Sequence, residues 1–344
     1  MLECNYSELS SKFKNFVDNG NGKKISILVH KNADGDCIGA SLAVSILLES
    51  LGYECKIISS NAYNRNFNWM PQISNVLTFN SLFRSTVINH IEESDRIICL
   101  DFSQKSRIDQ ELVTLIENKN VCIIDHHPDK PDINGHEILN PSASSTCEIV
   151  YEILNISYGD KLNKEIATCL YSGIISDTGH FVTQNMTYRV HEIAAELMKN
   201  FGLEVHIINK NLFGNNRFAR MRFLGHVLSR CLKIVPDYKV AYIVLKKEDT
   251  DRFFLKQGET DGLVNIALSI ENIEFAALFN QKTDGIYISL RSIGDFSVSD
   301  FSKKYFNGGG HKNAAGGFSN CSIEETVSNF INYLVNYNFL KFNR

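Results

Sequence analysis

Short apolar runs that end in Asp or His recur along the first half of this chain, and they restrict its fold more than any other feature. Runs rich in Ile and Val, bounded by polar turns, are typical of buried parallel strands. Helical patterns separate the runs, and alternating strands and helices predict a mostly parallel, doubly wound α/β sheet covered on both faces. The expected strands are Ser26–His30, Cys55–Ser59, Arg96–Asp101 and Val121–Asp125. The expected helices are Ile38–Leu51, Leu112–Glu117, Ser145–Leu154, Asn163–Ile175 and Val190–Asn200.

The pattern changes after about residue 200, which predicts a second, smaller domain. A chain of 344 residues is long enough for about two domains of ordinary size. Residues 201–216 are Asn-rich and weakly periodic, and we expect a linker there. We therefore expect an α/β domain over residues 1–200 and an α+β domain over residues 217–344. The elements expected in the second domain are a helix at Phe218–Leu232, strands at Lys239–Leu245, Glu274–Phe279 and Gly285–Arg291, and a final helix near Ile323–Val335.

Charge and composition exclude several classes of protein. With 35 Lys+Arg and 39 Asp+Glu the net charge is −4, which argues against a protein that holds long duplex nucleic acid by bulk charge. No apolar run is long enough to cross a membrane, and the first residues lack the pattern of a secretory signal. The nine cysteines show no CxxC pair, and Cys99 and Cys122 lie inside apolar runs. We therefore expect reduced, buried thiols, a cytoplasmic location and no membrane partner.

Acidic clusters follow four of the apolar runs, each at the expected C-terminal end of a strand. In an open parallel sheet, these ends form the crevice where ligands bind. One Asp after a strand is usually a turn or cap residue, but four such clusters within one domain predict a common site. The clusters are His30 to Asp36, Asp101, Asp125 to His127, and Asp177 in the run GIISD.

The charges of these clusters predict a metal site. Four carboxylates packed together without cations would repel each other, and some would have to bind protons. Two divalent metal ions would neutralise them, and carboxylates with some imidazole suit Mn²⁺ or Mg²⁺ better than Zn²⁺. Two such ions about 3.5–4 Å apart are the usual arrangement for hydrolysing phosphate esters. The expected ligands are the carboxylates of Asp34, Asp36, Asp101 and Asp177 and the imidazoles of His30 and His126.

The second domain carries a glycine run, Gly308–Gly310, directly before His311. Such a run can expose successive backbone N–H groups as an anion nest, and a helix opening after it would add positive charge. Arg291, at the end of an expected strand, is suited to bind a phosphate bidentately. Taken alone, the run is more often a flexible loop, but next to a phosphoesterase centre it predicts a phosphate-binding element.

Five motifs stand in order along the chain: HKNADGDCIGAS, LDFS, DHHPD, SDTGHF and GGGH. On these motifs the sequence resembles the DHH phosphoesterases that carry a C-terminal DHH-associated domain, from about residue 25 to residue 318. Within that family it is most similar to the stand-alone bifunctional oligoribonucleases. The resemblance implies a hydrolase that uses Mn²⁺, with Mg²⁺ or Co²⁺ as possible substitutes. It also implies an active site between the two domains, and very short RNAs and 3′-phosphoadenosine 5′-phosphate (pAp) as substrates.

The resemblance further implies a role for each motif residue. Asp125 would orient the ring of His126 without binding the metal itself, as metal-bound imidazoles usually require. His127 would face the substrate phosphate or the leaving oxygen, and would form the catalytic set with Asp101 and Asp177. His180, which lies within the fourth motif beside Asp177, is interpreted as a residue at the rim of the site. The implied ligands are His30 and Asp34 for one metal, Asp36 and His126 for the other, and Asp101 and Asp177 shared between them. The residues implied to bind the substrate's other phosphate are Arg291, Gly309, Gly310 and His311.

The sequence leaves several alternatives open. Cyclic-di-AMP or its linear product pApA would suit the same site, and so would pyrophosphate or polyphosphate. A nucleotide-binding sensor without catalysis is the alternative from another class, although the presence of all six expected ligands argues against it. The preferred substrate, the polarity of RNA degradation, the metal used in the cell and the oligomeric state are not determined by the sequence.

Overall fold

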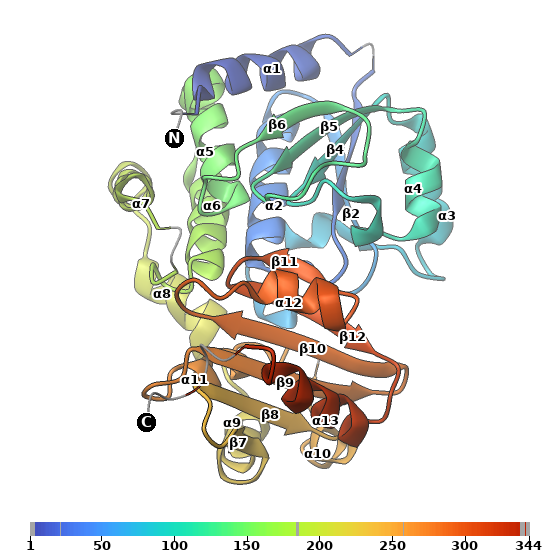
Figure 1. The fold of residues 1–344 in the computed structure, drawn as a ribbon. Coiled ribbons are helices and arrows are strands. Elements are labelled where there is room, and N and C mark those ends of the chain that lie inside the picture. Colours follow the sequence, from blue (N-terminus) through green and yellow to red (C-terminus); the bar gives the residue numbers. More distant parts are fainter. Residues whose placement is uncertain (1–3, 21, 184–185, 257, 338–340, 342–344) are drawn as a thin grey trace. The chain divides into compact units, whose positions relative to one another are not determined.

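The computed structural model describes residues 4–20, 22–183, 186–256, 258–337 and 341, and Figure 1 shows its elements. The chain divides into two compact units, Met1–Asn215 and Asn216–Arg344, and each unit contains its own sheet. The segment 201–216, predicted to be a linker, is instead mostly helical, and all of it except Asn216 belongs to the first unit. It contains α8 (Val205–Asn209) and a π-helical turn (Lys210–Gly214).

The sheet of the first unit is parallel, with the strand order β3-β2-β1-β4-β5-β6. The expected strands are confirmed, whereas β3 and β6 were not predicted because each is very short. From β1 the chain adds β2 and β3 on one side, and then returns to add β4, β5 and β6 on the other side. The strand order therefore reverses between β1 and β4, which are neighbours in the sheet. The strands are β1 (Lys24–Val29), β2 (Glu54–Ser59), β3 (Val76–Thr78), β4 (Arg96–Leu100), β5 (Asn120–Asp125) and β6 (His136–Leu139).

Helices cover both faces of this sheet, so the predicted doubly wound α/β architecture is confirmed. Successive strand residues point to opposite faces, and Ile27 packs into one hydrophobic core while Leu28 packs into the other. Figure 1 shows α3 and α4 on the side of the sheet opposite α5 and α6. The helices on the first face are α1 (Tyr6–Asp18), α2 (Gly35–Ser50), α5 (Thr146–Tyr158), α6 (Lys164–Asp177) and α7 (Tyr188–Phe201). Those on the second face are α3 (Arg84–Glu93) and α4 (Gln110–Ile116). Short 3₁₀ turns lie at Arg65–Phe67, Ile73–Asn75, Lys105–Arg107 and Gly159–Lys161.

Helix α2 is buried along nearly its whole length and lies directly against α6. The two helices approach closely because Gly39 has no side chain: a Cβ there would lie 2.5 Å from the carbonyl oxygen of Cys169. This close packing fixes the start of α2, which carries Asp36, relative to α6, which ends at Asp177.

The start of α5 is fixed by a side-chain cap, Ser145. Ser145 accepts a hydrogen bond from the N–H of Glu148 at 3.1 Å. The Glu148 carboxylate accepts from the N–H of Ser144 at 2.7 Å, one residue before the position that a standard capping box would use.

The second unit is built on a mixed sheet with the strand order β11-β12-β10-β9-β8-β7. Its α+β class agrees with the prediction. Strands β8 and β9 pair in parallel, and the other neighbours are antiparallel. The helix expected over residues 218–232 ends early, at α9 (Phe218–His226), and continues as a π-helical turn (Val227–Cys231) into β7. The strands are β7 (Leu232–Ile234), β8 (Val240–Leu245), β9 (Phe275–Lys282), β10 (Gly285–Ser292), β11 (Gly309–His311) and β12 (Ala314–Ser319). The remaining helices are α10 (Lys247–Arg252), α11 (Leu263–Leu268), α12 (Val298–Tyr305) and α13 (Ile323–Leu334).

Each unit has its own hydrophobic core on both faces of its sheet. In β9, Phe275 packs with α12 and α13, whereas the next residue, Ala276, packs with α9 and α11. None of the four core clusters formed by the described residues contains side chains from both units. Among the described residues, the helices are too short or too polar to span a bilayer.

Candidate metal centre

The predicted site lies where the strand order of the first sheet reverses. His30 directly follows β1 and Asp101 directly follows β4, the two strands that flank the reversal. Such a switch point is where open α/β sheets bind ligands, because neighbouring connections leave the sheet in opposite directions. The Nε2 atom of His30 lies 3.3 Å from Oδ2 of Asp101, so the two motifs meet across this point.

Asp101 is at the centre of the site. Its side chain is 2% exposed, and its backbone is left-handed with φ +65°, a conformation that Asp tolerates better than most residues. Its Oδ1 accepts a hydrogen bond from the Thr146 hydroxyl at 2.8 Å and lies 3.6 Å from Nε2 of His126. Burial alone would raise the pKa of Asp101, but the contacts with His30, His127 and His126 outweigh it and hold the pKa well below its usual range.

Asp36 is held at the N-terminus of α5. Its two carboxylate oxygens accept hydrogen bonds from the N–H of Thr146 at 2.6 Å and from the N–H of Cys147 at 2.9 Å. Burial, followed by the charges of Asp101 and Asp177, raises the pKa of Asp36 well above its usual value. The pKa values of Asp36 and Asp101 thus shift in opposite directions, as expected for neighbouring buried carboxyl groups that repel each other when no cation lies between them.

Asp177 joins the site from a helix, and the prediction that it ends a strand is wrong. The run GIIS forms the last turns of α6, and Asp177 is the final residue of that helix. Its Oδ2 lies 3.7 Å from Nε2 of His126, which also faces Asp101. The predicted helix Asn163–Ile175 is confirmed as α6 and continues to Asp177. Because α6 is buried on most sides, its apolar residues are nearly continuous, and the run before Asp177 therefore also resembles a strand.

Asp125 orients His127, and the prediction that it orients His126 is wrong. Oδ1 of Asp125 lies 2.7 Å from Nδ1 of His127 and also accepts the N–H of that residue at 3.1 Å. The Nδ1 atom of His126 instead lies 3.3 Å from the carbonyl oxygen of Ala143. Along an extended chain, residues i and i+2 share a side, and this periodicity would have identified His127 as the partner.

Contact between Asp125 and His127 shifts both pKa values in the direction that favours the charged forms. Burial lowers the pKa of His127, but the hydrogen bond to Asp125 and the charges of Asp101 and Asp125 raise it to about 9, against a small opposing effect of Arg107. Burial would raise the pKa of Asp125, yet its contact with His127 lowers it below the usual value. His127 is the more accessible partner, with a side chain that is 21% exposed.

Asp34 has a structural role in addition to the predicted one. It is the N-cap of α2, and its Oδ1 accepts hydrogen bonds from the N–H groups of Asp36 and Cys37, each at 3.1 Å. The residue is exposed, and its charge is close enough to contribute to the raised pKa of Asp36. A cap explains this Asp without a metal, so its role as a ligand stays a prediction.

The donor atoms fit a divalent cation. One carboxylate oxygen each from Asp36 and Asp101 and a ring nitrogen of His126 all lie within 4.8 Å of one another, and all three residues are buried. Oxygen donors with imidazole are the set that Mn²⁺ and Mg²⁺ accept, and burial of unneutralised carboxylates is unfavourable. Of the predicted ligands, the structure therefore brings together His30, Asp36, Asp101, His126 and Asp177.

Sequence reasoning missed three residues that line this site. Thr146 donates both its hydroxyl and its N–H to predicted ligands, although its place near the start of the expected helix Ser145–Leu154 gave no sign of this role. Two buried cysteines lie beside them: Cys37 forms a close cluster with His30 and Asp101, and Sγ of Cys147 lies 3.5 Å from the carbonyl oxygen of Asp36. The buried thiols predicted at Cys99 and Cys122 are confirmed, and the cysteines form no disulfide, all of them lying in the described residues.

In the second unit, Arg291 and His311 occupy the same row of the sheet. Arg291 of β10 pairs with Ala314 of β12, and Ala314 pairs on its other side with His311 of β11. Cross-strand partners in register place their side chains on one face, so the two residues share a face roughly 10 Å apart. This face is the one opposite the core residue Leu290.

The glycine run does not open a helix, and that part of the prediction is wrong. Gly309 and Gly310 form β11, which turns through Lys312 and Asn313 into β12. Gly310 has φ +138°, and a Cβ there would lie 2.5 Å from the carbonyl oxygen of Ala314, so only glycine fits. The run therefore shapes a tight hairpin edge and lacks the positive end of a helix that the prediction included.

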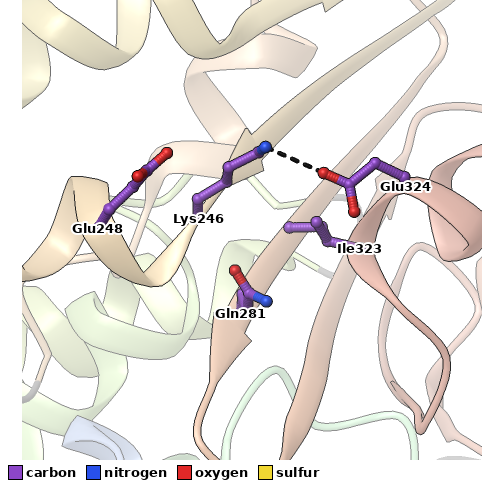
Figure 2. Close-up of a pocket in the computed structure, with 5 residues that line it drawn as sticks. All are labelled: Lys246, Glu248, Gln281, Ile323 and Glu324. Atoms are coloured by element: carbon purple, nitrogen blue, oxygen red, sulfur yellow. Dashed lines mark ion pairs between the residues drawn. The ribbon is translucent and has the colours of Figure 1, made fainter.

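A small pocket of about 260 Å³ also lies in the second unit, and Figure 2 shows its lining. Its main feature is an ion pair of 2.9 Å between Lys246 and Glu324. None of the residues predicted to bind substrate lines this pocket, and the internally paired charges give it no evident ligand. The lining residues are Lys246, Glu248, Gln281, Ile323 and Glu324.

Comparison with known proteins matches both units to described families. Residues 24–174 match the DHH family, N-terminal domain, and residues 237–336 match the DHHA1 domain. The bifunctional oligoribonuclease and PAP phosphatase NrnA of Mycoplasma genitalium is 29% identical over 321 residues, covering 91% of this chain and 94% of that protein.

Two solved structures are similar over nearly the whole chain. An exopolyphosphatase-related protein from Bacteroides fragilis has a TM-score of 0.89 and 33% identity, covering 97% of both chains. RecJ from Thermus thermophilus, solved in complex with Mn²⁺, has a TM-score of 0.57 and 14% identity, covering 98% of this chain and 55% of that one. The second similarity is one of fold alone.

Proposed function

This chain belongs to the DHH family and is a hydrolase of phosphoric ester bonds, and we propose that it removes mononucleotides from very short oligoribonucleotides and dephosphorylates pAp. The observation that carries the proposal is the convergence of His30, Asp36, Asp101 and His126 where the strand order reverses. The similarity to NrnA along most of both chains supports this choice of substrates.

We assign the metal-holding role to the six predicted ligands. Two Mn²⁺ ions, when bound, would supply the positive charge and Lewis acidity that phosphate ester hydrolysis requires. Asp101 is central to this assignment because its two oxygens face different imidazoles, Oδ2 facing His30 and Oδ1 facing His126. The residues that would hold the ions are His30, Asp34, Asp36, Asp101, His126 and Asp177.

His127 is proposed to act on the substrate itself. Asp125 fixes the ring through Nδ1, so Nε2 is the atom through which His127 can donate a proton. A ring held by a buried carboxylate is oriented and favours the charged form, which suits contact with a phosphate oxygen or donation to the leaving oxygen. Proton donation is thus assigned to His127, whereas metal binding is assigned to His126 and the other predicted ligands.

Arg291 and His311 are proposed to bind a phosphate of the substrate that does not react. Their common row on one face of the second sheet supports a joint role, since one anion between them can contact both side chains. Binding energy from such a remote group orients the reacting phosphate and favours short substrates that end in a phosphate. The proposal that the substrate lies between the two units stays a prediction.

A substrate panel tests the proposed function. With Mn²⁺, we expect pAp and RNAs of about two to five nucleotides to turn over faster than a long RNA, and EDTA to remove the activity. The panel also contains cyclic-di-AMP, pApA, pyrophosphate and polyphosphate, the last because of the name of the Bacteroides fragilis relative. Faster turnover of any of these four than of pAp and short RNA would contradict the proposal. Metal-dependent binding without turnover of any compound would indicate a sensor.

His311→Ala should raise KM for pAp by about tenfold or more while changing kcat less, because a charge-assisted contact to phosphate contributes about 1.5–3 kcal/mol. The residue is partly buried on a strand edge, so its removal should not unfold the unit. Steady-state kinetics on pAp separate the two parameters, and Lys312→Ala, an exposed neighbour in the hairpin turn, is the matched control. A collapse of kcat with unchanged KM would instead assign His311 to the chemical step.

A further inference from the structure

The turn that follows α6 has an unusual backbone. Gly179, His180 and Phe181 are three consecutive left-handed residues, with φ of +53°, +66° and +66°. Two of them carry a Cβ, which makes this conformation unfavourable. The turn is held by hydrogen bonds from the N–H of His180 to the carbonyl of Ile175 at 3.0 Å and from the N–H of Phe181 to the hydroxyl of Thr178 at 3.2 Å.

The two ring-bearing residues of this turn have different surroundings. Phe181 packs against the main hydrophobic core, with its ring 6.5 Å from that of Tyr171 and 5.1 Å from that of His191. His180 is exposed, and its ring lies 4.0 Å from that of Phe213 at an angle of 48°. Phe181 therefore anchors the turn, while His180 presents its ring at the surface.

Phe213 also comes from an irregular element. It belongs to the π-helical turn Lys210–Gly214, a kind of distortion that recurs at functional sites, and its side chain is 38% exposed. The same turn buries Leu212, so the turn is already anchored without the ring of Phe213. Two strained or irregular segments thus bring two exposed aromatic rings into contact.

A purely structural role explains this pair poorly. If the turn served only to end α6, glycine would adopt φ +66° at His180 without a steric penalty, as it does at Gly179. Both side chains stay exposed although their rings are in contact. The turn begins two residues after Asp177, a proposed metal ligand, so His180 follows the site closely along the chain.

We propose that His180 and Phe213 form a platform on which a nucleobase of the substrate stacks. Aromatic rings bind bases of any sequence because every base offers a flat π-face, which suits an enzyme for short RNAs of mixed sequence. This inference rests on the proposed function, since it assumes a substrate that carries a base. It assigns base contact to this platform and leaves phosphate contact to the other proposed residues.

The test measures kinetics of His180→Ala and Phe213→Ala on pAp and on a dinucleotide. We expect KM to rise between about 5-fold and 150-fold, the equivalent of losing about 1–3 kcal/mol of base stacking, with a smaller change in kcat. His180→Phe should restore most of the loss because it keeps a ring. Ribose 3,5-bisphosphate, which has the two phosphates without the base, should show the same KM with every variant. Tyr188→Ala, which removes an aromatic side chain that is 76% exposed elsewhere in the unit, is the control.

A stability measurement separates the platform from a structural role. His180→Gly should raise the melting temperature by about 2 °C or more, because it removes the left-handed penalty, and yet raise KM for pAp. An unchanged KM for pAp in both alanine variants would overturn the platform while the proposed function stands. Equal KM increases for pAp and for ribose 3,5-bisphosphate would also overturn it. If the wild-type enzyme hydrolyses neither pAp nor short RNA, the proposed function fails and the platform fails with it.

Discussion

Asp101→Asn should reduce kcat/KM for pAp with Mn²⁺ by more than about 100-fold, a larger loss than removing an outer partner of a metal site usually causes. Asparagine keeps the size of the side chain, keeps an oxygen that can accept the Thr146 hydroxyl, and tolerates the left-handed backbone at φ +65°. It removes the negative charge that faces both His30 and His126. The loss should therefore come from metal binding and catalysis, and the fold should survive.

Two measurements distinguish these effects. Thermal unfolding with and without Mn²⁺ should show that the metal raises the melting temperature of the wild type, since a ligand that binds only the folded state stabilises it. The rise should be much smaller for Asp101→Asn, with the metal-free melting temperature nearly unchanged. Asp160→Asn, at a position where the side chain is 78% exposed, should match the wild type in both respects. An unchanged activity in Asp101→Asn would remove this residue from the proposed ligand set.

Asp36→Ala should abolish activity and, unlike Asp101→Asn, also destabilise the metal-free protein by about 2 kcal/mol or more. Its carboxylate accepts the N–H groups of Thr146 and Cys147, and alanine would leave both donors buried without an acceptor. Each such orphaned group costs about 1–3 kcal/mol. Relief of the carboxylate's own burial, which raises its pKa, offsets part of this cost.

Urea unfolding of the metal-free protein measures the expected loss of stability. Asp36→Asn is the informative second variant: its amide oxygen can accept one of the two N–H groups, so its stability should lie between those of the wild type and Asp36→Ala. If Asp36→Ala is as stable as the wild type, the carboxylate does not contribute to capping α5, and its role is confined to the proposed metal.

The strands that carry the site could be predicted because their residues are buried on both faces. Runs such as that ending at Asp101 or Asp125 are uniformly apolar, short and followed by polar turns, which few other structures produce. The convergence of their ends then follows from the parallel topology alone. The strands β3 and β6 escaped prediction because three or four residues carry too little periodicity to stand out.

Errors arose where the identity of a local partner depends on contacts distant in sequence. A helix is predicted over Asn163–Ile175, but the nearly continuous apolar run before Asp177 also resembles a strand, and the prediction ends the helix two residues before its actual end at Asp177. The N–H groups that hold Asp36 come from residues more than a hundred positions later in the chain, so no local sequence pattern predicts this contact. The glycine run predicted an anion nest, but its residues pair in register with β12 instead.

The separation of the hydrophobic cores bears on how this family diversifies. Each of the described core clusters lies within one unit, so the core residues that neighbour Asp101 in β4 are all supplied by the first unit. Selection can then alter the residues on the second sheet, such as the row of Arg291 and His311, while the reaction chemistry stays fixed. New substrate preferences can then arise from changes in one half of the gene while the residues of the other half stay the same.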